Sequence, residues 1–186
     1  TGAQVARALL DANGLYDVQV EMTRGMLSDH YDPRTKKMRL SPQVYNSTSV
    51  AALGVAAHET GHAIQHAQAY IPLSIRNNLY PVAAIGSQMA FPLFFLGFLT
   101  WSQTLMSVAI WLFIGALAFQ VVTLPVEYNA SRRALAMLEG GGYLTQAEMP
   151  KAREVLNAAA LTYVAAAAMA ALQLLRLLVL RGARDD

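Results

Sequence analysis

The sequence predicts an α+β fold, that of a mainly helical membrane protein with a small β-sheet and about three transmembrane helices. Three observations lead to this expectation. Of the 186 residues, 55% are apolar and only 14% are charged, which is unusual for a soluble globular domain. Residues 77 to 126 contain no charged residue and no histidine. Short segments with the alternating pattern of β-strands occur before residue 41, ahead of a long helical segment.

Charge balance and cysteine content exclude several function classes. The chain has 14 basic and 12 acidic residues, a net charge of +2, which is not the basic surface of a nucleic-acid-binding protein. We therefore expect no nucleic-acid partner. Because the chain has no cysteine, disulfides, thiolate metal ligands and cysteine nucleophiles are ruled out. No secretory signal peptide is visible, since the first long apolar segment comes late in the chain.

The first 70 residues are expected to form short elements and one long helix. Helical periodicity over residues 2–12 predicts a first helix. Three short strands are expected next, at residues 18–22, 26–31 and 37–40. Turn-forming residues at 32–36 join the last two strands. The residues from Ser47 to Ser49 can then cap a long helix that runs to about Ala69.

The uncharged run at residues 77–126 predicts a transmembrane hairpin. It is too long for one span and long enough for two, since about 20 helical residues cross the hydrocarbon of a bilayer. Polar residues at 101–104 mark the break, so we expect helices at about 81–99 and 105–124. A second uncharged run, at residues 155–175, is rich in alanine and less lipophilic. It is expected either to span the membrane or to pack partly on protein.

A metal-binding motif lies within the long helical segment. His58, Glu59 and His62 form the pattern H-E-x-x-H, and residues four apart share one face of a helix. Two neutral imidazoles there can bind one zinc ion, and Glu59 beside them can take a proton from an activated water. The alternative is a pair of surface histidines that flank a helical glutamate. However, residues 50–65 are otherwise apolar and uncharged, and unpaired polar groups would be costly in such surroundings.

A catalytic zinc ion needs a third protein ligand. Glu127 is the first charged residue after the predicted hairpin, and a hairpin of two spans returns to the side from which His62 departed. Pro125 suits a helix start at this point, and the alternative is that a helix N-terminus simply favours the glutamate. Two other histidines are weaker candidates. An unbroken helix would carry His66 away from the ion, and His30 lies at the end of a strand.

With these motifs in place, the chain resembles the YugP-like family of membrane zinc metallopeptidases, whose plan is related to that of HtpX-type and CAAX-prenyl-protease-type peptidases. The matching segments are L-S-D-H-Y-D-P at 27–33, A-A-H-E-T-G-H-A at 56–63, E-Y-N-A-S-R-R-A at 127–134 and T-Y-V-A-A-A at 162–167. The resemblance implies a zincin-like catalytic part of gluzincin type. It also implies His58, His62 and Glu127 as zinc ligands, Glu59 as general base and a transmembrane segment ahead of Thr1.

The sequence departs from the wider gluzincin pattern at one position. In that pattern an aspartate four residues after the ligand glutamate orients a ligand histidine. Here the position is Ser131, whose hydroxyl can accept an imidazole N–H more weakly. Asn129 is another candidate for this support.

Hydrolysis of a peptide bond also needs a second donor that stabilises the oxyanion. His30, Tyr128 and Tyr163 are the candidates, and we expect Tyr163, in a C-terminal helix, to take this role. The alternative is that Tyr163 is a tyrosine at the membrane interface.

These expectations divide the chain into four parts. They are a zincin-like part at 1–79, a transmembrane hairpin at 80–124, a third-ligand helix and loop at 125–154, and a C-terminal membrane or membrane-packed helix with its tail at 155–186. The expected partners are a protein or peptide substrate and the lipid bilayer. Basic residues flank the membrane on the catalytic side but are missing from the hairpin tip, which indicates a cytoplasmic catalytic face on a bacterial plasma membrane. The C-terminal arginines argue against this orientation if residues 155–175 cross the membrane.

Two other functions are weighed against the peptidase. One is a catalytically inactive membrane scaffold or substrate-binding protein with a degenerate site, which the intact H-E-x-x-H motif argues against. The other is a metal transport or sensing protein. Such a protein would need ionisable ligands within its spans, and residues 77–126 have none.

Overall fold

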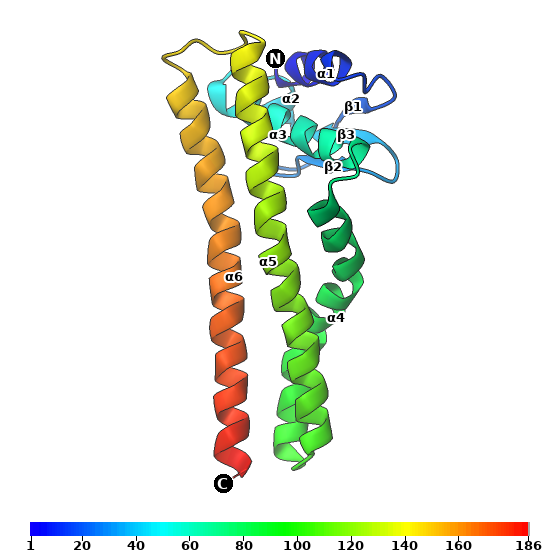
Figure 1. The fold of residues 1–186 in the computed structure, drawn as a ribbon, viewed down its shortest axis with the longest axis vertical. Coiled ribbons are helices and arrows are strands. Elements are labelled where there is room, and N and C mark those ends of the chain that lie inside the picture. Colours follow the sequence, from blue (N-terminus) through cyan, green and yellow to red (C-terminus); the bar gives the residue numbers. More distant parts are fainter. Residues whose placement is uncertain (186) are drawn as a thin grey trace. The chain divides into compact units, whose positions relative to one another are not determined.

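Residues 1–185, the part of the chain that the computed structural model describes, form six helices and three strands (Figure 1). In chain order these are α1 (Gly2–Ala12), β1 (Gln19–Met22), β2 (His30–Asp32), β3 (Lys37–Leu40), α2 (Pro42–Tyr45), α3 (Val50–Ala67), α4 (Ile71–Leu99), α5 (Gln103–Gly140) and α6 (Met149–Asp185). The predicted α+β class, mainly helical with a small sheet, is confirmed. The chain divides into two units, one of Thr1–Tyr70 with Val126–Ala160 and the other of Ile71–Pro125 with the chain from Leu161 on.

Local signals in the sequence set the starts of the two long helices of the first unit. The Thr1 side chain accepts a hydrogen bond from the Gln4 backbone N–H, and the Gln4 side-chain oxygen accepts one from the N-terminal ammonium of Thr1, which forms a capping box for α1. Ser49 caps α3 by accepting the backbone N–H of Ala52 at 3.2 Å. Such caps satisfy backbone donors that have no partner within the helix.

The sheet of the first unit has the strand order β1-β3-β2. β1 pairs with β3 in parallel and β2 pairs with β3 antiparallel. Met38 and Leu40 of the central strand are fully buried, whereas Lys37 and Arg39 alternate with them and are partly exposed. One face of the sheet therefore belongs to the core that positions α3.

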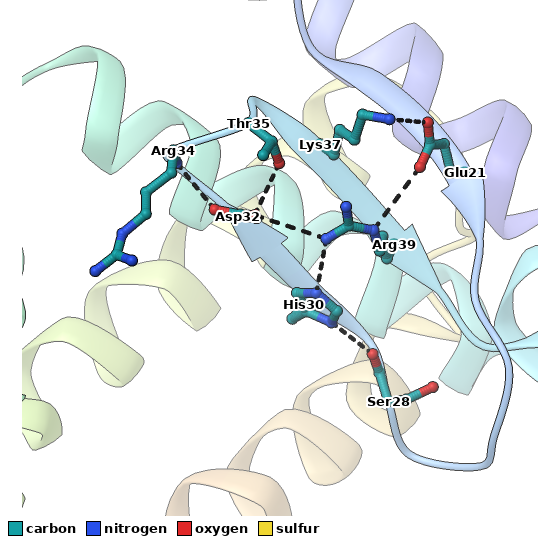
Figure 2. A network of polar contacts seen from close by, with 8 residues as sticks. All are labelled: Glu21, Ser28, His30, Asp32, Arg34, Thr35, Lys37 and Arg39. Atoms are coloured by element: carbon teal, nitrogen blue, oxygen red, sulfur yellow. Dashed lines mark hydrogen bonds and ion pairs between the residues drawn. The ribbon is translucent and has the colours of Figure 1, made fainter. Parts of the chain in front are cut away.

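Charged side chains cover the other face of this sheet (Figure 2). The Lys37 ammonium lies 2.6 Å from a carboxylate oxygen of Glu21. The Arg39 guanidinium lies between Glu21 on β1 and Asp32 on β2, at 3.8 and 3.6 Å. These pairs join all three strands, but each is partly exposed, and such pairs contribute little to stability.

The expected strand at residues 26–31 is wrong in its start, since β2 begins only at His30. Gly25 and Leu27 have φ angles of 101° and 53°, which a strand cannot accommodate. The Ser28 hydroxyl donates to the carbonyl oxygens of Arg24 and Gly25, at 3.3 and 3.2 Å. This local turn takes the place of the first half of the expected strand.

Helix α3 lies between two apolar clusters of the first unit. Leu53 and Ala57 belong to a cluster that includes Leu138 of α5 and Leu156 of α6. Another side of α3 supplies Ala52, Ala56 and Ala63 to a second cluster, which includes Met38 and Leu40 of the sheet. Because α3 is covered on both sides, its polar residues are held within the protein.

The second unit is built from long apolar helices. Three helices in the described part of the chain, α4, α5 and α6, are long and apolar enough to cross a membrane, in agreement with the predicted number. The core of the unit contains Phe94 of α4, Met106 and Phe113 of α5, and Leu177 of α6. Where α4 and α5 run side by side, the rings of Phe91 and Phe113 meet edge to face at 5.6 Å between centroids (Figure 1).

Two helix boundaries differ from those expected. α4 starts at Ile71, ahead of the expected residue 81, and includes Pro81. α5 is one helix from Gln103 to Gly140, so the expected helix start at Pro125 is wrong. Membrane helices accommodate proline where the surroundings satisfy the freed backbone groups. Glu127 therefore lies in the interior of a helix, and a helix N-terminus does not account for it.

Candidate metal centre

Three donor atoms converge in the first unit. They are Nε2 of His58 and Nε2 of His62, both on α3, and one carboxylate oxygen of Glu127 on α5. The two nitrogens lie 3.1 Å apart, and the oxygen lies 3.1 Å from the first and 3.6 Å from the second. Ligands at zinc-like bond lengths in a tetrahedral arrangement would be about 3.3 Å apart. Two imidazole nitrogens and a carboxylate oxygen at this spacing fit a zinc ion.

The site is enclosed and carries negative charge. Glu127 is only 3% exposed, and the two histidine side chains are 14% and 13% exposed. Burial alone would lower the pKa of His62, but its hydrogen bond with Glu127 and the charges of Glu59 and Glu127 outweigh burial and hold the pKa above its ordinary value. The surroundings therefore favour a positive charge at the point where the three donor atoms meet.

Each histidine uses its other ring nitrogen for a hydrogen bond within the protein. Nδ1 of His58 lies 3.1 Å from the hydroxyl of Ser131. Nδ1 of His62 lies 3.0 Å from Oε1 of Gln65. Partners of this kind orient imidazole ligands and leave Nε2 free to bind a metal. Asn129, the other candidate for this support, holds Gln65 by accepting its Nε2–H at 2.9 Å.

Gln65 is the residue of this site that the sequence analysis missed. It follows His62 by three residues, so both lie on one face of α3. The available signal was a glutamine in an otherwise apolar helix, because a buried amide needs hydrogen-bond partners. The sequence alone did not reveal which groups those partners would be.

Gly61 allows α3 and α5 to approach closely enough for Glu127 to reach the histidines. A Cβ atom at this position would lie 2.7 Å from the backbone oxygen of Ala130, one turn of α5 after Val126. That distance is below normal van der Waals contact, so any larger residue would push the two backbones apart. The glycine within the H-E-x-x-H segment thus has a packing role.

Glu59 lies beside this group of donors without belonging to it. It follows His58 on α3, is 8% exposed, and its charge raises the pKa of His62. A carboxylate in this place is close enough to influence the donors electrostatically. Its expected role as general base stays a prediction.

The remaining candidates lie elsewhere. Nδ1 of His30, on β2, donates a hydrogen bond to the carbonyl oxygen of Ser28 at 2.7 Å, and the Arg39 guanidinium lies 3.4 Å from its Nε2 (Figure 2). His66 is hydrogen-bonded to the phenol of Tyr31 at 3.0 Å, so it is held by the sheet. Among the described residues, neither histidine joins the three converging donors.

The two tyrosine candidates are placed differently. Tyr128 lies on α5 next to Glu127 and is 47% exposed. Tyr163 lies on α6, in the part of that helix that belongs to the second unit, and is half-buried. The expected role of Tyr163 as the oxyanion donor stays a prediction.

Comparisons with known proteins show the family of this chain. The family described as "Putative neutral zinc metallopeptidase" matches residues 1–182. The chain is 46% identical to the "Putative membrane protease YugP" of Bacillus subtilis (strain 168), and the match covers 100% of this chain and 83% of that protein. No solved structure matches the chain. By the extent of both matches, the chain belongs to this family.

Proposed function

We propose that this protein is a membrane-embedded zinc metalloendopeptidase of gluzincin type. The observation that carries the proposal is the convergence of His58, His62 and Glu127 on one buried point, with donor atoms 3.1 to 3.6 Å apart. His58 and His62 would hold the zinc ion through Nε2, and Glu127 would hold it through a carboxylate oxygen. The family and the name of the Bacillus subtilis relative support the same reaction class.

The proposed mechanism assigns each proton to a residue of the chain. When bound, zinc lowers the pKa of a coordinated water to about 7 and polarises the scissile carbonyl group. Glu59 accepts a proton from the attacking water and then donates it to the leaving nitrogen, so that the nitrogen leaves as a neutral amine and not as an amide anion, and the new C–O bond remains in the carboxyl product. Tyr163 is proposed to donate a hydrogen bond to the developing oxyanion.

The substrate is proposed to be a protein or peptide, met at a lipid bilayer. Helices α4, α5 and α6 would anchor the protein in a bacterial plasma membrane, in line with the name of the relative from Bacillus subtilis. Basic residues beside the apolar segments, such as Arg76 and Arg132, support a cytoplasmic position for the catalytic face.

Metal content tests the proposed zinc site. We expect about one zinc ion per purified wild-type chain in detergent micelles, and a sharp loss in Glu127→Ala, since a catalytic site needs three protein ligands. Glu139→Ala removes an exposed glutamate of the same helix and should leave the zinc content unchanged. Zinc retained in Glu127→Ala would remove Glu127 from the metal centre, and a wild type without zinc would favour the inactive scaffold.

Orientation can be tested because the chain has no cysteine of its own. In intact cells, a membrane-impermeant maleimide should label Ser102→Cys, in the turn between α4 and α5, but not Ser47→Cys, in the first unit. After lysis both variants should react. Labelling of Ser47→Cys in intact cells would reverse the proposed orientation without affecting the proposed chemistry.

A further inference from the structure

We propose that Gln65 is a positioning residue of the metal centre. Its single buried amide fixes the tautomer of His62 and at the same time holds the turn of α5 that carries Glu127. This inference rests on the proposed zinc site, but it concerns which residue prepares that site before the ion binds.

The hydrogen bonds of Gln65 leave its amide one orientation. The side chain is fully buried, and Nε2 donates to the backbone oxygen of Val126 at 2.8 Å and to Oδ1 of Asn129 at 2.9 Å. A backbone carbonyl can only accept a hydrogen bond, so the NH₂ group must be the end that faces Val126. Oε1 consequently faces Nδ1 of His62, at 3.0 Å.

This orientation determines the proton position on His62. An amide oxygen can only accept, so Nδ1 of His62 must carry the hydrogen of that bond. In the neutral imidazole the lone pair is then on Nε2, the atom that faces Glu127 and His58. Gln65 therefore keeps His62 in the tautomer that can bind a metal through Nε2.

The guanidinium of Arg133 supports the Gln65 amide indirectly, through Asn129. The Arg133 guanidinium donates from Nε to Oδ1 of Asn129 at 2.8 Å, and a guanidinium has no acceptor. The Asn129 oxygen is therefore held in place to receive the N–H of Gln65. If the Gln65 amide turned over, its oxygen would face the acceptors on Val126 and Asn129, and its NH₂ group would face His62.

The partner of the other histidine gives a useful contrast. Ser131, beside Nδ1 of His58, has a hydroxyl that can either donate or accept, so it accommodates both tautomers of that ring. Gln65 accommodates only one. Gln65 also contacts Val126, the residue directly before Glu127, and so links a ligand on α3 to the backbone of the ligand on α5. Removal of this amide should disturb two ligands at once.

The experiment measures zinc affinity of the full chain in detergent, by competition with a chromogenic chelator at pH 7. Gln65→Met keeps the length of the side chain but has no amide, and it should bind zinc about 10–100-fold more weakly. Gln65→Glu keeps an oxygen for the N–H of His62 but loses the donor to Val126 and Asn129, so its zinc affinity should fall between those of Gln65→Met and the wild type. Gln68→Met, an exposed position on the last turn of the same segment, is the matched control and should not change affinity.

A merely structural role for Gln65 would give a different pattern. Thermal melting of the metal-free proteins reports packing separately from zinc binding, and both Gln65 variants are expected to lose some stability. If Gln65→Met does not fold, variants of the half-buried Asn129 replace it in the experiment. Asn129→Ala should weaken zinc binding. Asn129→Asp keeps the oxygen that accepts from Gln65 and should bind zinc as the wild type does.

Two results would overturn the inference while leaving the peptidase intact. They are a Gln65→Met protein that binds zinc as tightly as the wild type, and a Gln65→Glu protein that binds it as weakly as Gln65→Met. A wild type that binds no zinc would instead refute the proposed function, and with it the metal-positioning role.

Discussion

The two units of this protein have interiors of opposite character. The first unit buries Glu59, Gln65, Glu127 and Ser131, and hydrogen bonds hold the last three to the histidines or to backbone. The described core of the second unit is built mainly of apolar and aromatic side chains, with glycines where backbones meet, and its buried Thr123 hydroxyl donates to the carbonyl oxygen of Phe119 in its own helix. Gly86, for example, lies against the backbone oxygen of Leu112, where no side chain would fit.

This difference shows how each unit reaches a defined structure. In the first unit, each buried polar atom specifies which partner must face it, because an unpaired polar group would be costly. In the second unit, the fit of surfaces decides the packing, since apolar contacts have no direction and small residues let helices approach. Packing substitutions in the first unit should therefore affect zinc binding as well as stability, whereas packing substitutions in the second unit, other than at Tyr163, should affect only stability.

The largest effect is expected for Glu59→Gln. Loss of the general base should lower the rate of casein cleavage about 10²–10⁴-fold. The zinc content should stay at the wild-type level, because Glu59 is not one of the three converging donors. Glu139→Gln, an exposed change of the same type, should leave cleavage intact. Wild-type activity in Glu59→Gln would remove Glu59 from the mechanism.

Glycine substitutions provide the sharpest comparison of the two units. Gly61→Ala should cost about 1–3 kcal/mol of stability and also lose zinc, because its Cβ would press against Ala130. Gly54→Ala, earlier in α3 with open space around the added Cβ, should gain about 0.5–1 kcal/mol. Gly86→Ala should destabilise the second unit but keep the zinc content.

Thermal melting measures the stability of the three glycine variants, and elemental analysis measures their zinc content. Normal zinc content in Gly61→Ala would show that the close approach of α3 and α5 is not needed for the site. Loss of zinc in Gly86→Ala would show that the metal centre depends on packing in the second unit as well.

A smaller effect is expected for Ser131→Ala. Without the hydroxyl, Nδ1 of His58 loses its partner, and zinc affinity should fall by about tenfold. Ser131→Asp introduces the gluzincin carboxylate and should tighten zinc binding beyond the wild type. Chelator competition measures both changes. Equal affinity in the three proteins would mean that His58 is oriented by packing alone.

Much of the architecture could be predicted because its signals are periodic. The apolar pattern predicted α1 and α3, and the uncharged run predicted the hairpin of α4 and α5. The topology of that hairpin also nominated Glu127, which the structure places beside His58 and His62. Its role as a ligand stays a prediction.

The predictions that were wrong or missing concern segments where rules based on neighbouring residues do not apply. The strand expected from residue 26 fails because left-handed backbone at Gly25 and Leu27 forms a turn. Pro125 does not begin a helix, because rules for helix starts come from water-exposed segments and α5 continues through it. Gln65 was missed because the groups it binds, Val126 and Asn129, are distant in sequence and come close only in the folded chain.

The order of the donors along the chain has a consequence for biosynthesis. His58 and His62 leave the ribosome early, but Glu127 follows only after the two apolar segments of α4 and α5 have been made. A nascent or truncated chain that ends before residue 127 holds two of the three converging donors. If all three are needed, a half-made molecule cannot cleave its neighbours at the insertion machinery, and proteolytic capacity arises only when membrane integration is well advanced.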